Sequence, residues 1–330
     1  MTVHEARPLP AGVTLRPYRG VSDVPAIARI LNAALADAGL DEYFSDDQMA
    51  IEMRPTRVFD PEADVIVAEA NGAMVAFARH EWVDTTDGQR EHRVWGDVDL
   101  AWRRRGIGAA LLAWNIGRAR TVAASHDTDR PRLLGSFTAE GEAAAQALLR
   151  RAGFSEVRWF FHMVARDLTA VPSWPLPGGV EIRPVTRDQA RQIFDADVEA
   201  FLDHWGGFDA SDEAFANWLE DPDFDPSLWV VAFAGDEVAG ASINAVRAAE
   251  NAALGVNRGW LDSVFVRRPW RRQGLARAIV GRSLDVLRDR GLDTGILGVD
   301  ADNPNGALGV YTANGFVVHQ RLTAWRRPLE

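Results

Sequence analysis

The 330-residue chain contains neither cysteine nor lysine. Without cysteine, the chain has no disulfide framework, cysteine nucleophile, cysteine-ligated zinc site or iron–sulfur cluster. All 36 basic residues are arginine, so Schiff-base chemistry and catalytic lysines are also excluded. No histidine or carboxylate pair has the spacing of a metal-ligand motif, so we expect no metal site.

Long apolar runs and excess positive charge are absent as well. No segment of about 18 consecutive apolar residues occurs, and the N-terminal residues mix acids and prolines where a signal peptide needs an apolar stretch. The 36 basic residues are outnumbered by 47 acidic ones, which gives a net charge of −11 and argues against a broad nucleic-acid surface. We therefore expect a cytoplasmic protein with no membrane and no nucleic-acid partner.

Hydrophobic residues make up 47% of the chain and charged residues 25%, which is typical of folded proteins. The length suggests about two domains, and an internal repeat supports this. Gly12–Pro17 reappears as Gly179–Pro184, Arg103–Gly108 as Arg271–Ala276, and the Gly-Phe pair at 153–154 as that at 315–316. We therefore expect two copies of one domain, residues 1–170 and 179–330, joined by the proline-rich linker 171–178.

Each copy shows the same order of expected elements. A short opening strand precedes a helix, at residues 24–38 in the first copy and 187–201 in the second, and a hairpin of two strands follows. The strand after this hairpin runs into the arginine-glycine segment, which opens another helix. A final strand and helix complete the copy. Strands joined partly by helices and partly by hairpins predict an α/β fold with a mixed sheet.

The arginine-glycine segment carries the strongest functional signal. It reads strand, Arg-x-x-Gly-x-Gly/Ala, helix, at residues 98–112 and again at 264–279. Glycine lets the backbone approach a ligand closely, and backbone N–H groups at a helix N-terminus can bind a diphosphate. An ordinary helix start is the alternative for either copy alone. The segment lacks the Gly-x-Gly-x-x-Gly pattern of dinucleotide sites and the lysine of the Walker loop.

These motifs resemble the GNAT acetyltransferases, whose pyrophosphate loop is Gln/Arg-x-x-Gly-x-Gly/Ala. The second copy also resembles the family's closing strand and helix, from Val299 through Asp300–Asn305 to Phe316. The resemblance implies two tandem GNAT domains that use acetyl-CoA. In the second copy it assigns cofactor binding to Val264, Phe265, Val266, Arg271, Arg272, Gln273, Gly274, Leu275, Ala276, Arg277 and Asn303. In the first copy it assigns the same role to Val98, Arg103, Arg104, Arg105, Gly106, Ile107 and Gly108.

The resemblance implies that Tyr311, at the family's Tyr-x-x-x-Gly-Phe spacing, protonates the departing thiolate of coenzyme A. A phenol with a pKa of about 10 is protonated at neutral pH. The alternative is that Tyr311 only packs its helix against the sheet. The first copy has Leu149 at this position, so we expect turnover in the C-terminal domain and an N-terminal domain that either holds acetyl-CoA or braces its neighbour. This asymmetry resembles the tandem layout of the mycothiol synthases.

The base and the acceptor site are less clearly marked. Strand alternation puts Asp262, Val264 and Val266 on one face, where Asp262 could accept a proton from an ammonium acceptor directly or through a water. It could equally bind the acceptor or cap a neighbouring element. Mycothiol synthases have an acid where this chain has Trp260. His204 and Trp205 lie in the loop after the first helix of the second copy, where the family builds its acceptor site, although a solvated loop histidine is the alternative.

Together these observations predict an acetyl-CoA-dependent N-acetyltransferase that acts on a primary amine of a small molecule by direct attack. Backbone N–H groups near Phe265 and Val266 would polarise the thioester carbonyl. The alternative is a non-catalytic protein that binds or senses coenzyme A. The sequence leaves open the acceptor's identity, an acyl group other than acetyl, and whether the protein is a monomer or a homodimer.

Overall fold

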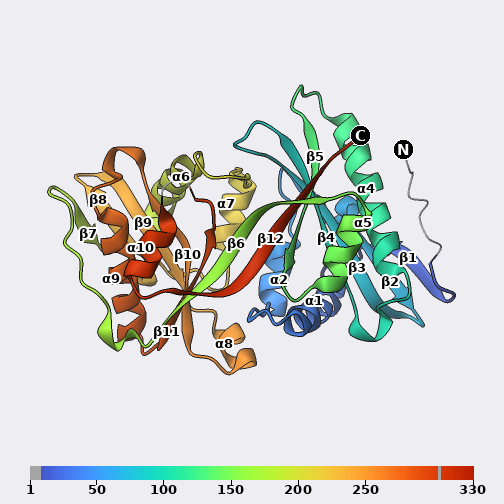
Figure 1. Cartoon of the computed structure of the whole chain (residues 1–330), viewed down its shortest axis with the longest axis horizontal. Helices are drawn as coiled ribbons and strands as arrows, with labels where there is room; N and C mark the ends of the chain where they lie inside the picture. Colours follow the sequence, from blue (N-terminus) through green and yellow to red (C-terminus); the bar gives the residue numbers. More distant parts are fainter. Residues whose placement is uncertain (1–8, 304–305) are drawn as a thin grey trace. The chain divides into compact units, whose positions relative to one another are not determined.

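The computed structural model describes residues 9–303 and 306–330 and divides into two compact units (Figure 1). Unit 1 contains the described residues up to Arg158 together with Gly206–Asn217 and Leu322–Glu330. Unit 2 contains Trp159–Trp205 and Trp218–Arg321. These units divide the chain differently from the two sequence repeats, because each includes residues of the other repeat.

Unit 1 is built on a six-stranded sheet in the order β1-β2-β3-β4-β5-β12. The strands β4 and β5 pair in parallel, and the other neighbours in this sheet are antiparallel. The strands are β1 (Val13–Pro17), β2 (Val65–Ala70), β3 (Ala73–Asp84), β4 (Arg90–Val98), β5 (Arg132–Ala139) and the last part of β12 (Val317–Pro328). The helices are α1 (Val24–Ala38), α2 (Asp46–Glu52), α3 (Pro61–Asp64), α4 (Ile107–Ser125) and α5 (Ala143–Arg151).

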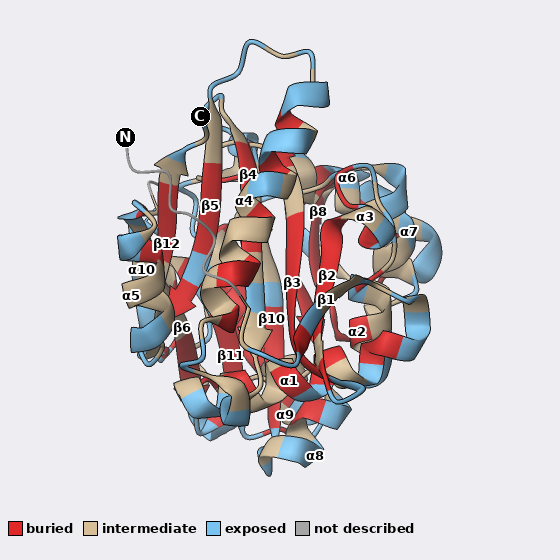
Figure 2. Cartoon of the chain, turned by 90° about the vertical axis from the view of Figure 1, so that its right-hand side faces the viewer, coloured by how far each residue is buried: buried red, intermediate tan, exposed pale blue. Residues whose placement is uncertain are grey.

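Apolar side chains cover both faces of this sheet. One core cluster joins α1 and α2 to β2 and β3, and two further clusters join α4 and α5 to the sheet. As a result β2 and β3 are buried along most of their length (Figure 2). Near-continuous apolar strands such as Val65–Ala70 are what a sheet covered on both faces requires.

Unit 2 repeats the arrangement with a six-stranded sheet in the order β6-β11-β10-β9-β8-β7. The strands are β6 (Ser155–Arg166), β7 (Glu181–Arg183), β8 (Val230–Ala234), β9 (Glu237–Ala245), β10 (Arg258–Val266) and β11 (Thr294–Asp300). The helices are α6 (Ala190–Phe201), α8 (Ala248–Leu254), α9 (Leu275–Asp289) and α10 (Ala307–Ala313). The helix α7 (Asp212–Leu219) lies mostly in the segment Gly206–Asn217, which belongs to unit 1. Only β10 and β11 are parallel among the strand pairs described for this sheet.

The last strand of each sheet comes from the other repeat. In unit 1, Leu322–Pro328 of β12 pairs with β5, and the buried Trp325 donates its indole N–H to Thr138 at 2.8 Å. In unit 2, Phe160–Arg166 of β6 pairs with β11. The two strands have therefore exchanged places relative to a simple pair of repeats.

The expected elements agree with the observed ones in order and type. The helix expected over residues 24–38 is α1, and the expected hairpins are β2–β3 and β8–β9. The parallel pairs β4–β5 and β10–β11 within otherwise antiparallel sheets confirm the mixed α/β fold. In the described residues, no helix is both long and apolar enough to cross a membrane.

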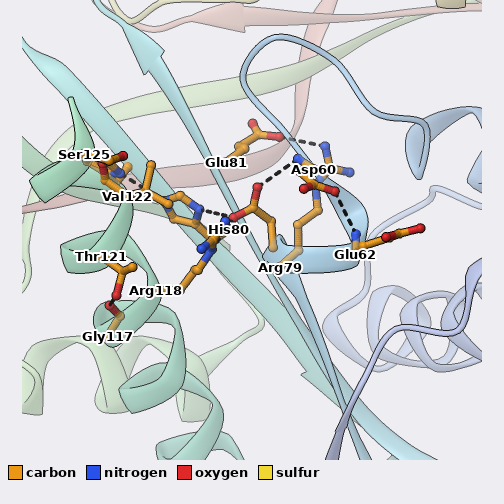
Figure 3. A network of polar contacts seen from close by, with 12 residues as sticks. Asp60, Glu62, Arg79, His80, Glu81, Gly117, Arg118, Thr121, Val122 and Ser125 are labelled. Carbon is orange, nitrogen blue, oxygen red and sulfur yellow. Dashed lines mark hydrogen bonds and ion pairs between the residues drawn. The ribbon is translucent and has the colours of Figure 1, made fainter. Parts of the chain in front are cut away.

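A chain of buried polar side chains crosses the α4 side of unit 1 (Figure 3). His80 of β3 is fully buried and lies 3.0 Å from a carboxylate oxygen of Asp64 and 3.0 Å from Nδ1 of His92. Arg118 of α4 donates to the same Asp64 oxygen at 2.7 Å. Burial lowers the pKa of His92 to about 3, so this imidazole is neutral at neutral pH.

Candidate active site

The two arginine-glycine loops have the same backbone conformation. Gly106 and Gly274 have φ of 90° and 85°, and each precedes the first residue of a long helix, α4 or α9. Arg104 and Arg272 both have φ of 64°, a left-handed conformation that is costly for a residue with a side chain. A Cβ atom added at either glycine would meet nothing within 4 Å. Both loops thus offer an open cradle of backbone N–H groups at a helix N-terminus, which suits a diphosphate.

The first arginine of each loop is engaged within the protein. Arg271 donates to the carbonyl at the end of β10 at 2.9 Å and to a carboxylate oxygen of Asp203 at 2.6 Å. Arg103 makes the corresponding contacts with the end of β4, at 3.2 Å, and with Asp37, at 2.5 Å. These side chains join the end of β10 or β4 to the end of α6 or α1, so the loop backbone and exposed residues such as Arg272 are the groups left to contact an anion.

The remaining loop residues hold the helix start in place. Ile107 and Leu275 are each 1% exposed and anchor their helices in the core. Arg105 and Gln273 each donate to the carbonyl four residues earlier, at 2.9 and 3.1 Å. Arg277 lies over the ring of Trp174, with its guanidinium carbon 5.4 Å from the ring centroid. Gly108 and Ala276 are the last residues of the Arg-x-x-Gly-x-Gly/Ala motif in each copy, and both are half-buried.

The strands β10 and β11 of unit 2 separate after Trp260 of β10. Residues 258–260 of β10 pair with β11, the last pair being Trp260 with Ile296. From Leu261 onward β10 pairs only with β9 among the described strands, through Val266 opposite Gly240. Backbone groups of Val264, Phe265 and Val266 on the β11 side therefore have no strand partner. The resemblance to the GNAT family implies that the pantetheine arm of coenzyme A pairs with these backbone groups of β10.

A β-bulge at Asp262 corrects the alternation expected for this strand. The register with β9 shifts between Leu261 and Ser263, so Asp262 is the extra residue. Leu261 and Val264 both pack against the core cluster under α9, whereas Ser263 contacts α6. The regular alternation that would place Asp262 and Val264 on one face is therefore interrupted, because Asp262 is itself the extra residue of the bulge.

Asp262 is paired and partly exposed. A carboxylate oxygen lies 2.7 Å from Nη2 of Arg247, and 34% of its side chain is exposed. Desolvation by surrounding protein atoms raises the pKa of Asp262, while Arg247 opposes this shift. Trp260 is buried and donates its indole N–H to Glu250 at 2.6 Å. The tryptophan at the position where mycothiol synthases have an acid is thus part of the structural core.

Tyr311 lies on α10 within the core cluster that also contains Leu261. Its side chain is 7% exposed, and its ring lies edge-on to Phe316 with centroids 5.9 Å apart. Burial raises the pKa of the phenol, so it is protonated at all ordinary pH values. Asn303 follows β11, where its N–H donates to the carbonyl of Asp300 at 3.2 Å. Pro304 and Asn305, part of the expected closing motif, lie outside the described residues.

The sequence analysis did not identify Asp197 as a candidate. Asp197 is on α6, and its carboxylate accepts a hydrogen bond of 2.7 Å from the hydroxyl of Ser263, the residue after the bulge. Burial raises the pKa of Asp197 to about 6, although this hydrogen bond opposes the shift. The signal was present in the helical spacing, because Asp197 falls between the buried Ile193 and Ala200 on the face that packs against the sheet.

His204 and Trp205 follow α6 as expected. The His204 ring lies against Phe201, with centroids 4.2 Å apart, and Trp205 lies 5.9 Å from Phe160. Burial lowers the pKa of His204, and Arg271 lowers it further, while Asp300 and Asp203 raise it. His204 therefore lies near both the anion-binding loop and the end of β11.

The matching region of unit 1 is built differently. The pairing of β3 with β4 runs without a register shift from Val98 to Arg90, so there is no bulge. The position of Ser263 is occupied by Trp95, which packs edge-on against Phe77. Leu149 is buried in the core at the position of Tyr311. Unit 1 therefore lacks the bulge, the hydroxyl and the phenol of unit 2.

Two further close approaches are found in unit 1. Ser136 of β5 donates to the carbonyl of Val94 at 2.8 Å, just beyond the last paired residues of β4 and β5, whereas unit 2 has Leu297 in the place of this serine. A Cβ atom at Gly141 would lie 2.1 Å from the carbonyl oxygen of Ala38. The loop after β5 thus packs directly against the end of α1.

Comparisons with known proteins agree with this picture. The model of the acetyltransferase (GNAT) family matches residues 190–316, and that of an acetyltransferase (GNAT) domain matches residues 61–156. A mycothiol acetyltransferase of Salinispora tropica is 30% identical over 312 residues, which cover 90% of this chain and 89% of the relative. A mycothiol acetyltransferase of a Nocardioides species is 28% identical over 226 residues, covering 65% and 72%.

Solved structures share the fold along the whole chain. A GCN5-related N-acetyltransferase from Sphaerobacter thermophilus has a TM-score of 0.72 at 23% identity and covers 98% of both chains. A tandem GNAT protein from the clavulanic acid biosynthesis pathway has a TM-score of 0.70 at 19% identity, covering 96% of this chain and 99% of its own. Each repeat matches a GNAT family model, and a relative is 30% identical over 90% of this chain. The chain therefore belongs to the GNAT acetyltransferase family and is an acyltransferase with two tandem domains.

Proposed function

We propose that the protein transfers the acetyl group of acetyl-CoA to a primary amine of a small molecule by direct attack, in unit 2. The arrangement around β10 carries this proposal: a strand with unpaired backbone groups beyond Trp260, a bulge at Asp262, and the buried phenol of Tyr311 beside it. Unit 1 shares the loop but not the bulge or the phenol. Turnover in unit 1 would lack a leaving-group acid.

The residues present fit acetyl-CoA, which supplies the acetyl thioester when bound. The N–H groups of Arg272–Arg277 and the side chain of Arg272 would hold the diphosphate. Backbone groups of Val264–Val266 would pair with the pantetheine arm, and Asn303 would lie beside it. The same backbone conformation at Arg103–Gly108 would allow diphosphate binding in unit 1 as well.

Tyr311 would donate a proton to the departing sulfur, because burial keeps its hydroxyl protonated. The N–H groups near Phe265 and Val266 would polarise the thioester carbonyl. Asp262 has two possible roles: it could be the general base, or it could bind the acceptor. Its ion pair with Arg247 favours binding of the acceptor, because a carboxylate held by a guanidinium is a weaker base.

The acceptor site is proposed to lie on the α6 side of β10, with His204 and Trp205 in its wall. Asp221 is close enough to raise the pKa of Asp262, so two carboxylates would face an incoming acceptor. This charge favours a cationic small molecule over an anionic one. We expect the protein to act in the cytoplasm as a monomer or a homodimer.

Thiol release from acetyl-CoA, measured with and without a panel of small primary amines, tests the proposal. Amine-dependent thiol release together with acetylated product supports an N-acetyltransferase. Calorimetric binding of acetyl-CoA with no release under any condition would instead favour the alternative, a non-catalytic coenzyme A binding protein. No binding at all would contradict both.

A further inference from the structure

The strand β10 presents different chemistry on its two faces at the bulge. Ser263 points toward α6, where its hydroxyl contacts Asp197 at 2.7 Å. The next residue, Val264, packs on the opposite face against the cluster that contains Tyr311. A carboxylate and a phenol therefore flank the strand on opposite faces, next to the backbone groups that have no strand partner.

We propose that Asp197 is the general base of unit 2 and takes the proton from the acceptor ammonium on the face opposite Tyr311. This inference rests on the proposed function and names a catalytic residue for it. An amine that enters from the α6 side would be on the face of β10 that Asp197 contacts, and the thiolate would depart on the side of Tyr311.

The step balances in protons and electrons. Asp197 accepts one proton from the ammonium, and the nitrogen lone pair then forms the bond to the carbonyl carbon. The carbon–sulfur bond breaks with its electron pair on sulfur. The nitrogen releases its second proton to solvent, and Tyr311 gives its proton to sulfur and takes one back from solvent. Asp197 then releases its proton to solvent. The products are an amide, free coenzyme A and one proton.

Asp197 is better suited to this role than Asp262. No arginine contacts Asp197 among the described residues, and its one hydrogen-bond partner is the neutral Ser263. Asp262 is held by Arg247 at 2.7 Å. A base is more effective when its pKa approaches the operating pH, and burial moves the pKa of Asp197 to about 6.

The charged groups on elements packed against α6 are already engaged elsewhere. On β10 and the loop after it, Arg258 pairs with Glu250, Asp262 with Arg247, and Arg267 with Glu199 and Glu237. Before α6, Arg187 donates to the carbonyl of Leu219. None of these groups contributes to the pKa of Asp197, which burial raises and the Ser263 hydroxyl lowers.

The equivalent helix of unit 1 provides an internal contrast. When the buried positions of α1 and α6 are superposed, Ile27 on Ile193 and Ala34 on Ala200, Asp197 corresponds to Leu31. Leu31 packs against the core cluster between α1 and the sheet. A carboxylate at this position is thus no requirement of the fold, and it occurs in the unit that has the phenol.

The test compares D197N, D262N and D195N with the unaltered chain by following thiol release from acetyl-CoA between pH 5 and 9. Glucosamine is the amine probe, and water serves as the acceptor in its absence. Asp195 is the matched control, because it is exposed on the same helix and pairs with Arg191. We expect D197N to lower kcat/KM by about 100-fold and to remove the loss of rate below pH about 6. D195N should leave both rate and profile unchanged.

A second variant separates catalysis from folding. S263A removes the hydrogen bond that lowers the pKa of Asp197 and should move the acid limb of the profile to higher pH while activity persists. A rate and an acid limb that survive in D197N, with loss in D262N instead, would overturn the assignment to Asp197. An unaltered chain that releases no thiol with glucosamine or with water would overturn the proposed function itself.

Discussion

Tyr311 of unit 2 and Leu149 of unit 1 occupy the same position of their last helices, four residues before a Gly-Phe pair, and both are buried against the sheet. Packing alone is therefore satisfied by leucine. At this position the two units differ by the hydroxyl of Tyr311, which is the proton donor in the proposed reaction.

Replacing Tyr311 with phenylalanine should lower kcat by about 100-fold, because the leaving thiolate loses its proton donor. The dissociation constant for acetyl-CoA should change little, since the ring and its packing remain. Stopped-time thiol assays and calorimetry measure the two quantities. Unchanged turnover would show that Tyr311 has only a packing role.

The two loops allow a matched test of which unit holds the reacting cofactor. G274W and G106W each place a bulky side chain into an open cradle at a left-handed residue, so the backbone strain of about 1–2 kcal/mol is shared. We expect G274W to abolish acetyl transfer and G106W to retain it. Calorimetric stoichiometry of acetyl-CoA on both variants then counts the sites. Loss of transfer in G106W alone would move catalysis to unit 1.

Asp203 ties the anion-binding loop to the end of α6 through Arg268 and Arg271. Hydrogen bonds from these arginines hold the pKa of Asp203 well below its usual range. The stabilisation is therefore present above the unfolded pKa of about 4 and is lost as the pH falls through the folded value.

D203N should consequently be less stable than the unaltered chain by about 1–2 kcal/mol at pH 7, and the difference should shrink as the pH falls below 4. Urea unfolding at several pH values measures it. The exposed Asp195 again supplies the control, and D195N should change stability by less than about 0.5 kcal/mol. A difference that is independent of pH would contradict the ion-pair explanation.

The buried histidines of unit 1 make stability depend on pH in another window. His92 has a pKa of about 3 in the folded protein because of burial, against about 6.5 when unfolded. The unfolded chain binds the extra proton between these values, so stability falls as the pH falls from 6.5 toward 3.

H92Q should remove up to about 1.4 kcal/mol per pH unit from this slope. Denaturant unfolding between pH 7 and 4 compares the two slopes. Identical slopes in the variant and the unaltered chain would mean that His92 does not titrate on unfolding as described.

Much of the fold and part of the site follow from local patterns. The helix at Val24–Ala38, the hairpins and both arginine-glycine loops were predictable, because apolar periodicity and glycine position act within a few residues. The bulge at Asp262 was not, because a strand's register is set by its partner β9. Asp197 was missed because its role depends on Ser263, 66 residues away.

The sequence by itself determined the duplication, the mixed α/β class, the two arginine-glycine loops and the absence of a tyrosine from the first copy at the position of Tyr311, since each is carried by residues close together in the chain. Only the tertiary structure decided which strands complete each sheet. β6 and β12 both follow a Gly-Phe pair, but β12 pairs with β5 and β6 with β11, with contacts such as that between Trp325 and Thr138, which lie 187 positions apart in the sequence. The placement of Asp197 and Tyr311 on opposite faces of β10 was decided in the same way, by packing between elements distant in sequence.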